Sequence, residues 1–214
     1  MSLKFKNIVR EYSEAPLTSQ LVQEALEEYN RPYDKISELI KSGDLQQIKK
    51  GLYIPGPDSG ISAPEAALVA NHLWGPSYVS METALSHWGL IPERVYEISC
   101  VTLKAGRKYN TPIGRFIYFH TNSPYYSYGI THVTLTSRQV ALMATPEKAL
   151  CDKIIMTSGI FLRSVKQTIS FLEDDLRIDR ERLLALNRDH IQSWVSHAPK
   201  KTSLQMLLKT LKKL

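Results

Sequence analysis

The sequence of 214 residues predicts an α+β protein in two parts. Residues 1–58 are expected to form three helices and a β-hairpin, and residues 59–214 a mixed α+β domain with a small, mostly antiparallel sheet. Three observations support this fold class. Apolar residues recur at helical spacing in three segments before residue 43. Two short runs that alternate like strands then flank a basic turn. Farther along, segments rich in Val, Ile, Tyr, Phe and Thr are flanked by helix patterns and do not alternate strictly with them.

The first part begins with three predicted helices. The first spans about residues 3–12, and the second runs over about 18–29 from a Thr or Ser cap. The third begins at Pro32, because proline fits the first turn of a helix, and ends at Gly43. We expect its inner face to consist of four apolar residues, Tyr33, Ile36, Leu39 and Ile40.

A hairpin and a linker complete the first part. Residues 45–48 and 52–54 alternate as strands, and Lys49-Lys50-Gly51 forms the turn, where glycine supplies a permissive backbone. The run Pro-Gly-Pro-Asp-Ser-Gly at 55–60 is the clearest linker in the chain. It predicts a domain boundary near residue 58.

The second part contains both helix and strand patterns. Helices are predicted at 64–73, 80–88, 146–157 and 162–173, and strands at 96–103, 113–120 and 131–136. Residues 202–214 form a basic amphipathic helix with leucines along one side. This tail can pack on its own domain, bind the groove of a partner, or contact DNA.

Composition excludes several classes of protein. A hydrophobic content of 43% excludes a disordered chain. No apolar run approaches the roughly 18 residues of a membrane span, and the N-terminus lacks the features of a signal peptide. With only Cys100 and Cys151, neither a disulfide framework nor a zinc site is expected. We therefore expect a cytoplasmic protein with no membrane contact.

The net charge of +6 is unevenly distributed. Residues 1–60 carry a net charge of −1, residues 61–179 carry +1, and residues 180–214 carry +6. Neutralisation of phosphates dominates affinity for nucleic acids. If the first part binds DNA, it must therefore concentrate its few cations on one face.

A helix followed directly by a basic hairpin is typical of winged helix-turn-helix domains, whose reading helix enters the major groove of DNA. On the outward face of the third helix, Lys35, Ser37 and Lys41 are candidate contacts to bases or phosphates, and Asp34 or Glu38 can accept from cytosine N4. The other candidate DNA contacts are Arg31 before that helix, Lys49 and Lys50 at the hairpin tip, and Ser19 and Gln20 at the start of the second helix. The alternative is a solvated helix face and a polar turn.

Two segments of the second part are candidate partner-binding surfaces. Lys104, Arg107, Lys108 and Arg115 cluster around a loop between strands and can face an acidic partner or DNA. The loop at 124–129 contains Tyr125 and Tyr126, and exposed aromatic residues would mark an interface. Solvation of the charged loop and packing of the aromatic loop onto the sheet remain alternatives.

The sequence does not predict an enzyme. Glu147 and Asp152 lie five residues apart on one helix, about 140° around its axis, so they do not converge on one metal ion. We interpret them as a helix cap and surface charge. The six histidines lack metal-ligand spacing, the serines lack a nucleophile elbow, and no glycine-rich phosphate loop exists. We therefore expect no cofactor and no metal.

Three segments resemble one protein family. The run Gly-Asp-Leu-Gln-Gln-Ile-Lys-Lys-Gly-Leu-Tyr at 43–53 resembles the winged-helix end of the AbiEi family of bacterial antitoxins. The run Tyr-Val-Ser-Met-Glu-Thr-Ala-Leu-Ser-His-Trp-Gly-Leu-Ile-Pro at 78–92 is similar to the segment that opens the antitoxin domain of that family. The run Ala-Thr-Pro-Glu-Lys-Ala-Leu-Cys-Asp-Lys at 144–153 looks like its late helix start. The segments follow the order of the family and frame residues 30–155.

The resemblance implies a transcriptional repressor that is also an antitoxin. Its N-terminal domain would bind double-stranded DNA at an inverted repeat in its own promoter, as two copies, and its C-terminal domain would counter a toxin of the nucleotidyltransferase type. The sequence departs from this pattern in placing Asp34 and Glu38 on the reading face. The alternatives are an antitoxin that acts by protein interaction with little DNA binding, and a nucleic-acid-processing enzyme.

Overall fold

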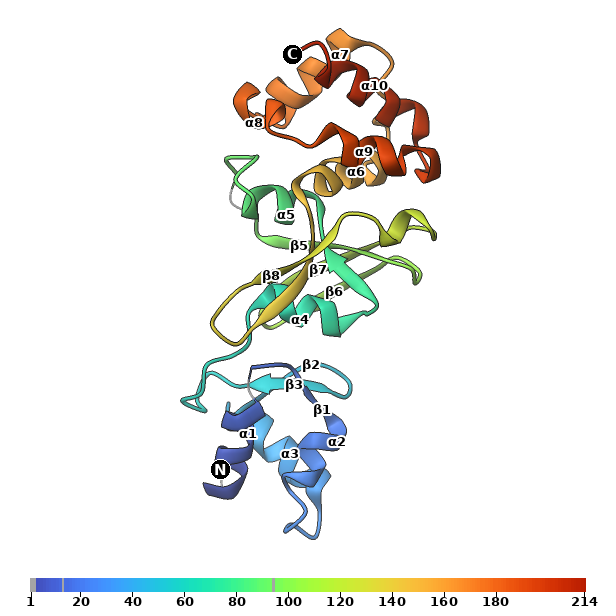
Figure 1. Cartoon of the computed structure of the whole chain (residues 1–214). Helices are drawn as coiled ribbons and strands as arrows, with labels where there is room; N and C mark the ends of the chain where they lie inside the picture. The colour runs from blue at the N-terminus through green and yellow to red at the C-terminus, as the bar shows by residue number, and fades with distance from the viewer. Residues whose placement is uncertain (1–2, 13, 94) are drawn as a thin grey trace.

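The computed structural model describes residues 3–12, 14–93 and 95–214 of the chain. It has three tiers: the N-terminal unit, a sheet with two helices at its ends, and a helical cap that contains the C-terminus (Figure 1). This arrangement confirms the predicted α+β class. Within the described residues, no helix has the length and apolar character needed to cross a membrane.

The N-terminal unit combines three helices with a small antiparallel sheet. The helices are α1 (Leu3–Tyr12), α2 (Ser19–Glu24) and α3 (Pro32–Lys41), and the strands are β1 (Leu17–Thr18), β2 (Leu45–Lys49) and β3 (Leu52–Pro55). The strand order is β1-β3-β2. The three predicted helices and the hairpin are therefore present, although α2 stops five residues early because turns follow it. The two residues of β1 are too few to leave a pattern in the sequence.

The hairpin contributes side chains to two hydrophobic cores. Leu45 and Tyr53 pack in the core of the N-terminal unit. Ile48, Leu52 and Ile54 belong to the larger core of the second part. The two parts therefore meet across the hairpin, and its second face is covered.

The segment predicted as a linker is packed against the end of α3. The amide of Gly56 donates to the carbonyl of Asp44 at 3.0 Å, and the amide of Asp58 donates to the carbonyl of Gly43 at 2.9 Å. Gly43 has a φ of +72°, which L-residues rarely adopt. This glycine both ends α3 and lets the following segment approach closely.

The second part is built on a six-stranded sheet with the order β6-β7-β5-β4-β9-β8. Its strands are β4 (Ser77–Val79), β5 (Glu97–Thr102), β6 (Arg107–Thr111), β7 (Gly114–His120), β8 (Ile130–Thr134) and β9 (Val140–Ala144). The pairs β4–β5, β6–β7 and β8–β9 are antiparallel, and β5–β7 and β4–β9 are parallel. Three of the five pairs are antiparallel, as the prediction of a mostly antiparallel sheet requires, but the two parallel pairs make the sheet mixed. The sheet is also larger than predicted, because β4, β6 and β9 were not recognised.

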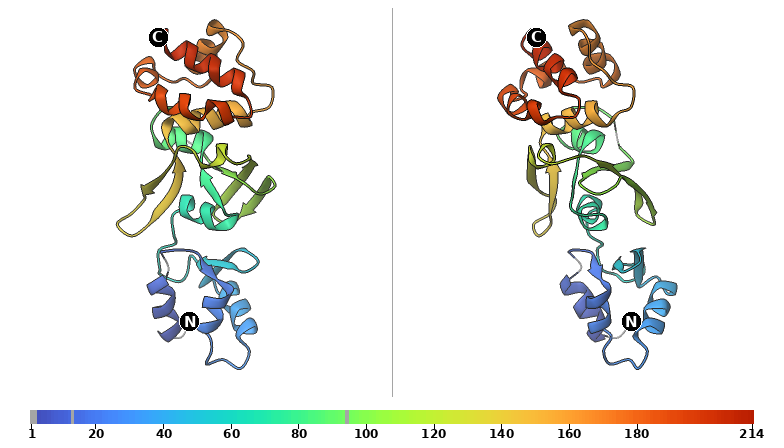
Figure 2. Two further views of the ribbon diagram at one scale, coloured as in Figure 1. Left: turned by 45° about the vertical axis from the view of Figure 1, so that its right-hand side comes forward. Right: turned by 90° about the vertical axis from the view of Figure 1, so that its right-hand side faces the viewer.

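Helices cover the two ends of this sheet (Figure 2). Those in the central tier are α4 (Ala66–Leu73), α5 (Met81–His87) and the short 3-10 turn η1 (Tyr125–Ser127). The cap contains α6 (Pro146–Met156), α7 (Val165–Ile169), the π-helical segment η2 (Ser170–Asp175), α8 (Arg180–Leu184), α9 (Arg188–Trp194), η3 (Val195–His197) and α10 (Lys201–Leu211). The helix predicted at 162–173 is thus divided into α7 and η2, and α8 and α9 were not predicted.

The basic tail helix packs on its own domain. Four leucines of α10 are buried in the larger core: Leu204, Leu207, Leu208 and Leu211. Lys209, Lys212 and Lys213 are exposed on the other side. Of the three alternatives for this tail, self-packing is the one observed.

Candidate functional site

The outward face of α3 carries paired charges. The Lys35 ammonium donates to Glu38 Oε2 at 2.7 Å, and this hydrogen bond raises the pKa of Lys35 and lowers the pKa of Glu38. Arg31 and Asp34 form a second, exposed ion pair at 3.7 Å. Two of the predicted DNA-binding cations are therefore held by acidic neighbours one helical turn away.

The remaining α3 candidates are exposed. Ser37 Oγ donates to the carbonyl of Tyr33 at 3.1 Å, and Lys41 is exposed in the last turn. The prediction that Tyr33 faces inward is wrong, since 68% of this residue is exposed. It lies in the first turn of α3, beyond the apolar side chains that line the core.

The predicted hairpin tip is partly covered. The Lys49 ammonium donates to the carbonyl of Leu73, at the C-terminal end of α4. Burial lowers the pKa of Lys49, and the nearby charges of Lys104 and Arg107 lower it further. Lys49 therefore lies between the two parts of the chain, whereas Lys50 is exposed.

Ser19 lies beside the hairpin turn that contains Lys49 and Lys50. Its amide donates to the carbonyl of Gly51 at 3.0 Å, so the start of α2 lies beside the hairpin tip. Gln20 follows on the exposed side and donates to Glu24 at 2.9 Å.

Cations and aromatic rings from both parts of the chain meet in one cluster, which we name the basic junction: Lys49, Trp74, Lys104, Arg107 and Tyr109. The Lys104 ammonium lies 5.0 Å and the Arg107 guanidinium 4.9 Å from the centre of the Trp74 ring. Arg107 also lies 5.1 Å from the centre of the Tyr109 ring. The Trp74 indole N–H donates to the carbonyl of Ala105 at 3.1 Å, which fixes the ring against the loop.

Lys108 and Arg115 lie outside the basic junction. Side chains alternate along a strand, so Lys108 projects from the face of β6 opposite to Arg107. Its partner on β7 is Ile117. Arg115 forms an ion pair with Glu97 at 2.7 Å. The sequence therefore located the charged loop correctly but could not divide its cations between the two faces.

The aromatic loop packs inward. Tyr125 is 1% exposed, and its hydroxyl donates to Asp152 Oδ1 at 2.9 Å. Tyr126 is half-buried, with its ring centre 5.2 Å from that of Tyr78. For both predicted partner-binding tyrosines, packing is the alternative that the structure adopts.

Asp152 is the centre of a fully buried polar cluster. Its carboxylate also accepts from the Tyr78 hydroxyl at 3.0 Å and from Ser80 Oγ at 2.7 Å. The Lys148 ammonium lies 3.4 Å from Asp152 Oδ1 and donates to the carbonyl of Tyr125 at 2.8 Å. Burial raises the pKa of Tyr78 and of Tyr125 and lowers the pKa of Lys148.

The interpretation of Glu147 and Asp152 as surface charge is therefore wrong. Asp152 is buried completely, and Glu147 is 8% exposed and accepts from the amide of Asn187 at 2.9 Å. The spacing of Lys148 and Asp152, four residues apart on one helix, was the signal for this pair. Because both side chains are enclosed, the cluster joins α6 to its neighbours and offers no access to a substrate.

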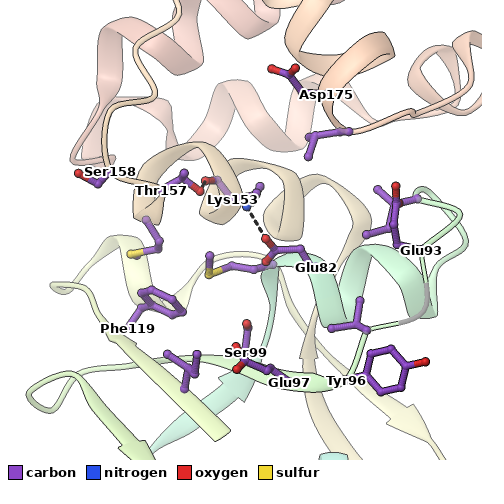
Figure 3. Close-up of a pocket in the computed structure, with 16 residues that line it drawn as sticks. Glu82, Glu93, Tyr96, Glu97, Ser99, Phe119, Lys153, Thr157, Ser158 and Asp175 are labelled. Atoms are coloured by element: carbon purple, nitrogen blue, oxygen red, sulfur yellow. Dashed lines mark hydrogen bonds and ion pairs between the residues drawn. The ribbon is translucent and has the colours of Figure 1, made fainter. Parts of the chain in front are cut away.

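A groove of about 820 Å³ lies between α5, the C-terminal end of α6, the end of η2 and one face of β5 and β7. Figure 3 shows the Lys153–Glu82 ion pair near its middle, with Phe119 and Ser158 toward one end and Tyr96 toward the other. The remaining polar residues that line it are Glu93, Glu97, Ser99, Thr157 and Asp175.

Two strained residues border this groove. Met81, in its lining, has a φ of +53°, and Arg177, which pairs with the lining residue Glu93, has a φ of +51°. Neither is a glycine, so each conformation costs free energy. The sequence contained no signal for this groove, because its residues come from five separate segments.

Among the described residues, no three His, Cys, Asp or Glu side chains are arranged to hold a metal ion. No protein-family model matches the chain, and no curated protein matches it in sequence. The resemblance to AbiEi antitoxins therefore rests on the three segments quoted above.

Proposed function

We propose that this chain is a DNA-binding transcriptional regulator in which both parts contribute to one DNA-binding surface. The observation that carries the proposal is the basic junction, where Lys104 and Arg107 lie over the Trp74 ring and Lys49 of the hairpin is close to both of them. Cations interleaved with aromatic rings suit a phosphate backbone.

The charge distribution favours a surface shared by both parts. Residues 1–60 carry a net charge of −1, and α3 neutralises Lys35 and Arg31 with its own carboxylates. This unit alone offers few free cations for phosphates. Lys104 and Arg107 add two from the second part, next to the hairpin.

Crowding of like charges also points to an anionic ligand. Lys104 and Arg107 both lower the pKa of Lys49, because each of them repels its ammonium group in the free protein. A phosphate placed among them relieves this repulsion. The cluster is therefore better suited to the bound state than to the free one.

The outward face of α3 supplies the groups that would distinguish bases. Lys41 is an exposed donor, the exposed Ser37 hydroxyl can accept while it donates to Tyr33, and Asp34 and Glu38 are exposed acceptors suited to cytosine N4. In this proposal the winged helix-turn-helix unit places α3 in the major groove while the basic junction contacts the backbone. Repression of its own promoter as two copies on an inverted repeat, and neutralisation of a toxin, extend the proposal on the resemblance alone.

The test is a fluorescence-anisotropy titration with DNA from upstream of the gene and with scrambled duplex, at several salt concentrations. We expect Lys104→Ala/Arg107→Ala to weaken binding to both DNAs and to reduce the slope of log K against log salt by roughly two. Lys41→Ala should reduce the preference for the upstream DNA.

Lys108→Ala is the matched control, because this lysine lies on the same strand as Arg107 but on its other face. It should leave the affinity for both DNAs and the slope of log K against log salt nearly unchanged. Binding that is absent, or that falls equally in the Lys108 and the Lys104/Arg107 variants, would contradict the proposal.

A further inference from the structure

The first turn of α3 presents a large aromatic side chain to solvent. Tyr33 is 68% exposed, compared with 48% for Tyr12 of α1. Ser37 Oγ donates to the backbone carbonyl of Tyr33, but no hydrogen bond or ring contact joins the Tyr33 ring or hydroxyl group to another described residue. An aromatic ring gains free energy when it is buried, and the core of the N-terminal unit leaves that gain unused at this position. The ring is therefore available to a partner.

Tyr33 begins an exposed stripe along α3. Ser37 and Lys41 follow it at intervals of four residues, and all three side chains are exposed. Residues four apart lie on the same side of a helix, and a rise of 1.5 Å per residue places them about 6 Å apart along its axis. The acidic residues Asp34 and Glu38 form the neighbouring stripe, about 100° around the helix. The first stripe therefore offers an aromatic ring, a hydroxyl group and an ammonium group, and no carboxylate.

The position of Tyr33 suits contact with the edge of a base pair. In a helix-turn-helix, the N-terminal residues of the reading helix contact base edges, and Tyr33 is the second residue of α3. Thymine alone among the four bases presents a methyl group in the major groove, where apolar side-chain atoms contact it. The uncharged ring of Tyr33 matches this methyl group, whereas phosphates bind cations and cytosine N4 binds carboxylates.

We propose that Tyr33 determines sequence specificity by packing its ring against the C5-methyl group of a thymine in the major groove. This inference rests on the proposed function, because it requires α3 to lie in that groove. It adds a preference that the charged side chains of α3 do not supply, since charged groups are stabilised by hydrogen bonds and not by contact with a methyl group.

Replacement of thymine by uracil in the DNA tests the contact directly, because uracil pairs in the same way and lacks only the methyl group. Fluorescence anisotropy measures the affinity of the full chain for the upstream DNA prepared with either base. We expect the unmodified chain to bind the thymine DNA more tightly, by about fourfold for each methyl group that it covers. Tyr33→Ala should bind both DNAs equally, with an unchanged slope of log K against log salt because no charge is removed. Tyr33→Phe keeps the ring and should keep the preference for thymine.

Two control variants separate this contact from other effects. Tyr12→Ala removes an exposed tyrosine of the same unit that does not lie on α3, and it should keep the preference for thymine. Lys104→Ala/Arg107→Ala should weaken binding to both DNAs by the same factor and reduce the salt slope, and it should also keep that preference.

The outcomes distinguish the inference from the proposed function. Salt-dependent binding in which the unmodified chain does not prefer thymine would overturn the role of Tyr33 alone. A preference for thymine that survives Tyr33→Ala, or that Tyr12→Ala removes equally well, would have the same meaning. Absence of binding to either DNA would overturn the proposed function and the inference together.

Discussion

Replacement of Asp152 by alanine tests the structural role of the buried cluster. The carboxylate accepts from three hydroxyl groups and faces the Lys148 ammonium, and both charged side chains are 0% exposed. Asp152→Ala leaves a buried ammonium without a counter-ion and three hydroxyl groups without their acceptor. Each of these groups would have to find a new partner in an apolar interior.

The magnitude follows from the loss of one partner of a buried ion pair, which costs about 3–5 kcal/mol. For a chain of this length each kcal/mol lowers the melting temperature by roughly 2–4 °C. We therefore expect Asp152→Ala to lower the melting temperature by about 6–20 °C. Asp174→Ala removes an exposed carboxylate and should change the stability by no more than about 0.5 kcal/mol.

Tryptophan fluorescence during urea unfolding is a suitable assay, because Trp74, Trp88 and Trp194 all lie in the second part. Asp152→Asn should destabilise the protein, since it leaves Lys148 charged and unpaired. Adding Lys148→Met to Asp152→Asn should restore part of that loss, because no buried charge then remains. The reasoning is refuted if Asp152→Ala costs less than about 1 kcal/mol, or if the two substitutions are simply additive.

Three further predictions concern single side chains. Lys200→Met removes an ammonium group that donates to three carbonyls at and after the end of α6, at 2.7 to 2.9 Å. It should lower the free energy of unfolding in urea by about 1–3 kcal/mol. The control Lys201→Met removes an exposed ammonium group and should lower it by less than about 0.5 kcal/mol. Gly43→Ala should lower the free energy of unfolding by at least about 1 kcal/mol, because alanine disfavours the positive φ and its Cβ would collide with the Asp58 carboxylate. Thermal unfolding followed by circular dichroism measures this loss. An unchanged melting temperature would contradict the prediction. Burial and neighbouring cations lower the pKa of Lys49 from 10.5, so its contribution to stability rises with pH between the folded and the unfolded pKa. Lys104→Ala should raise that pKa in an NMR titration of the lysine side chains, and no change would show that the charges are not coupled.

Much of the fold was predictable because local signals decided it. The helix start at Pro32 and the turn at Gly51 were read from residue types that favour these positions. The strands β6 and β9 were not, for two different reasons. The sequence of β6, Arg-Lys-Tyr-Asn-Thr, contains a single aromatic residue and no aliphatic one, and that of β9, Val-Ala-Leu-Met-Ala, is as suited to a helix as to a strand. Pairing decides their conformation: β6 pairs with β7, and β9 pairs with β8 and with the distant β4.

The candidate sites were predictable only in part, for the same reason. The sequence identified Lys49, Lys104 and Arg107 as cations on loops, but only the fold brings the hairpin against α4 and the β5–β6 loop. It presented Asp152 as a surface residue, because a polar partner from another element leaves no mark on the helix that it contacts. Met81 gave no signal at all, since a strained backbone in a helix-like segment has no pattern of its own.

The β6–β7 hairpin lies between the basic junction and the groove and contributes residues to both. Arg107 and Tyr109 face the basic junction, and Tyr109 meets Tyr118 of β7 edge-on, with ring centres 5.9 Å apart. On the other face of β7, Ile117 lines the groove. Because side chains alternate along each strand, DNA at the basic junction would be separated from the groove by the thickness of one sheet.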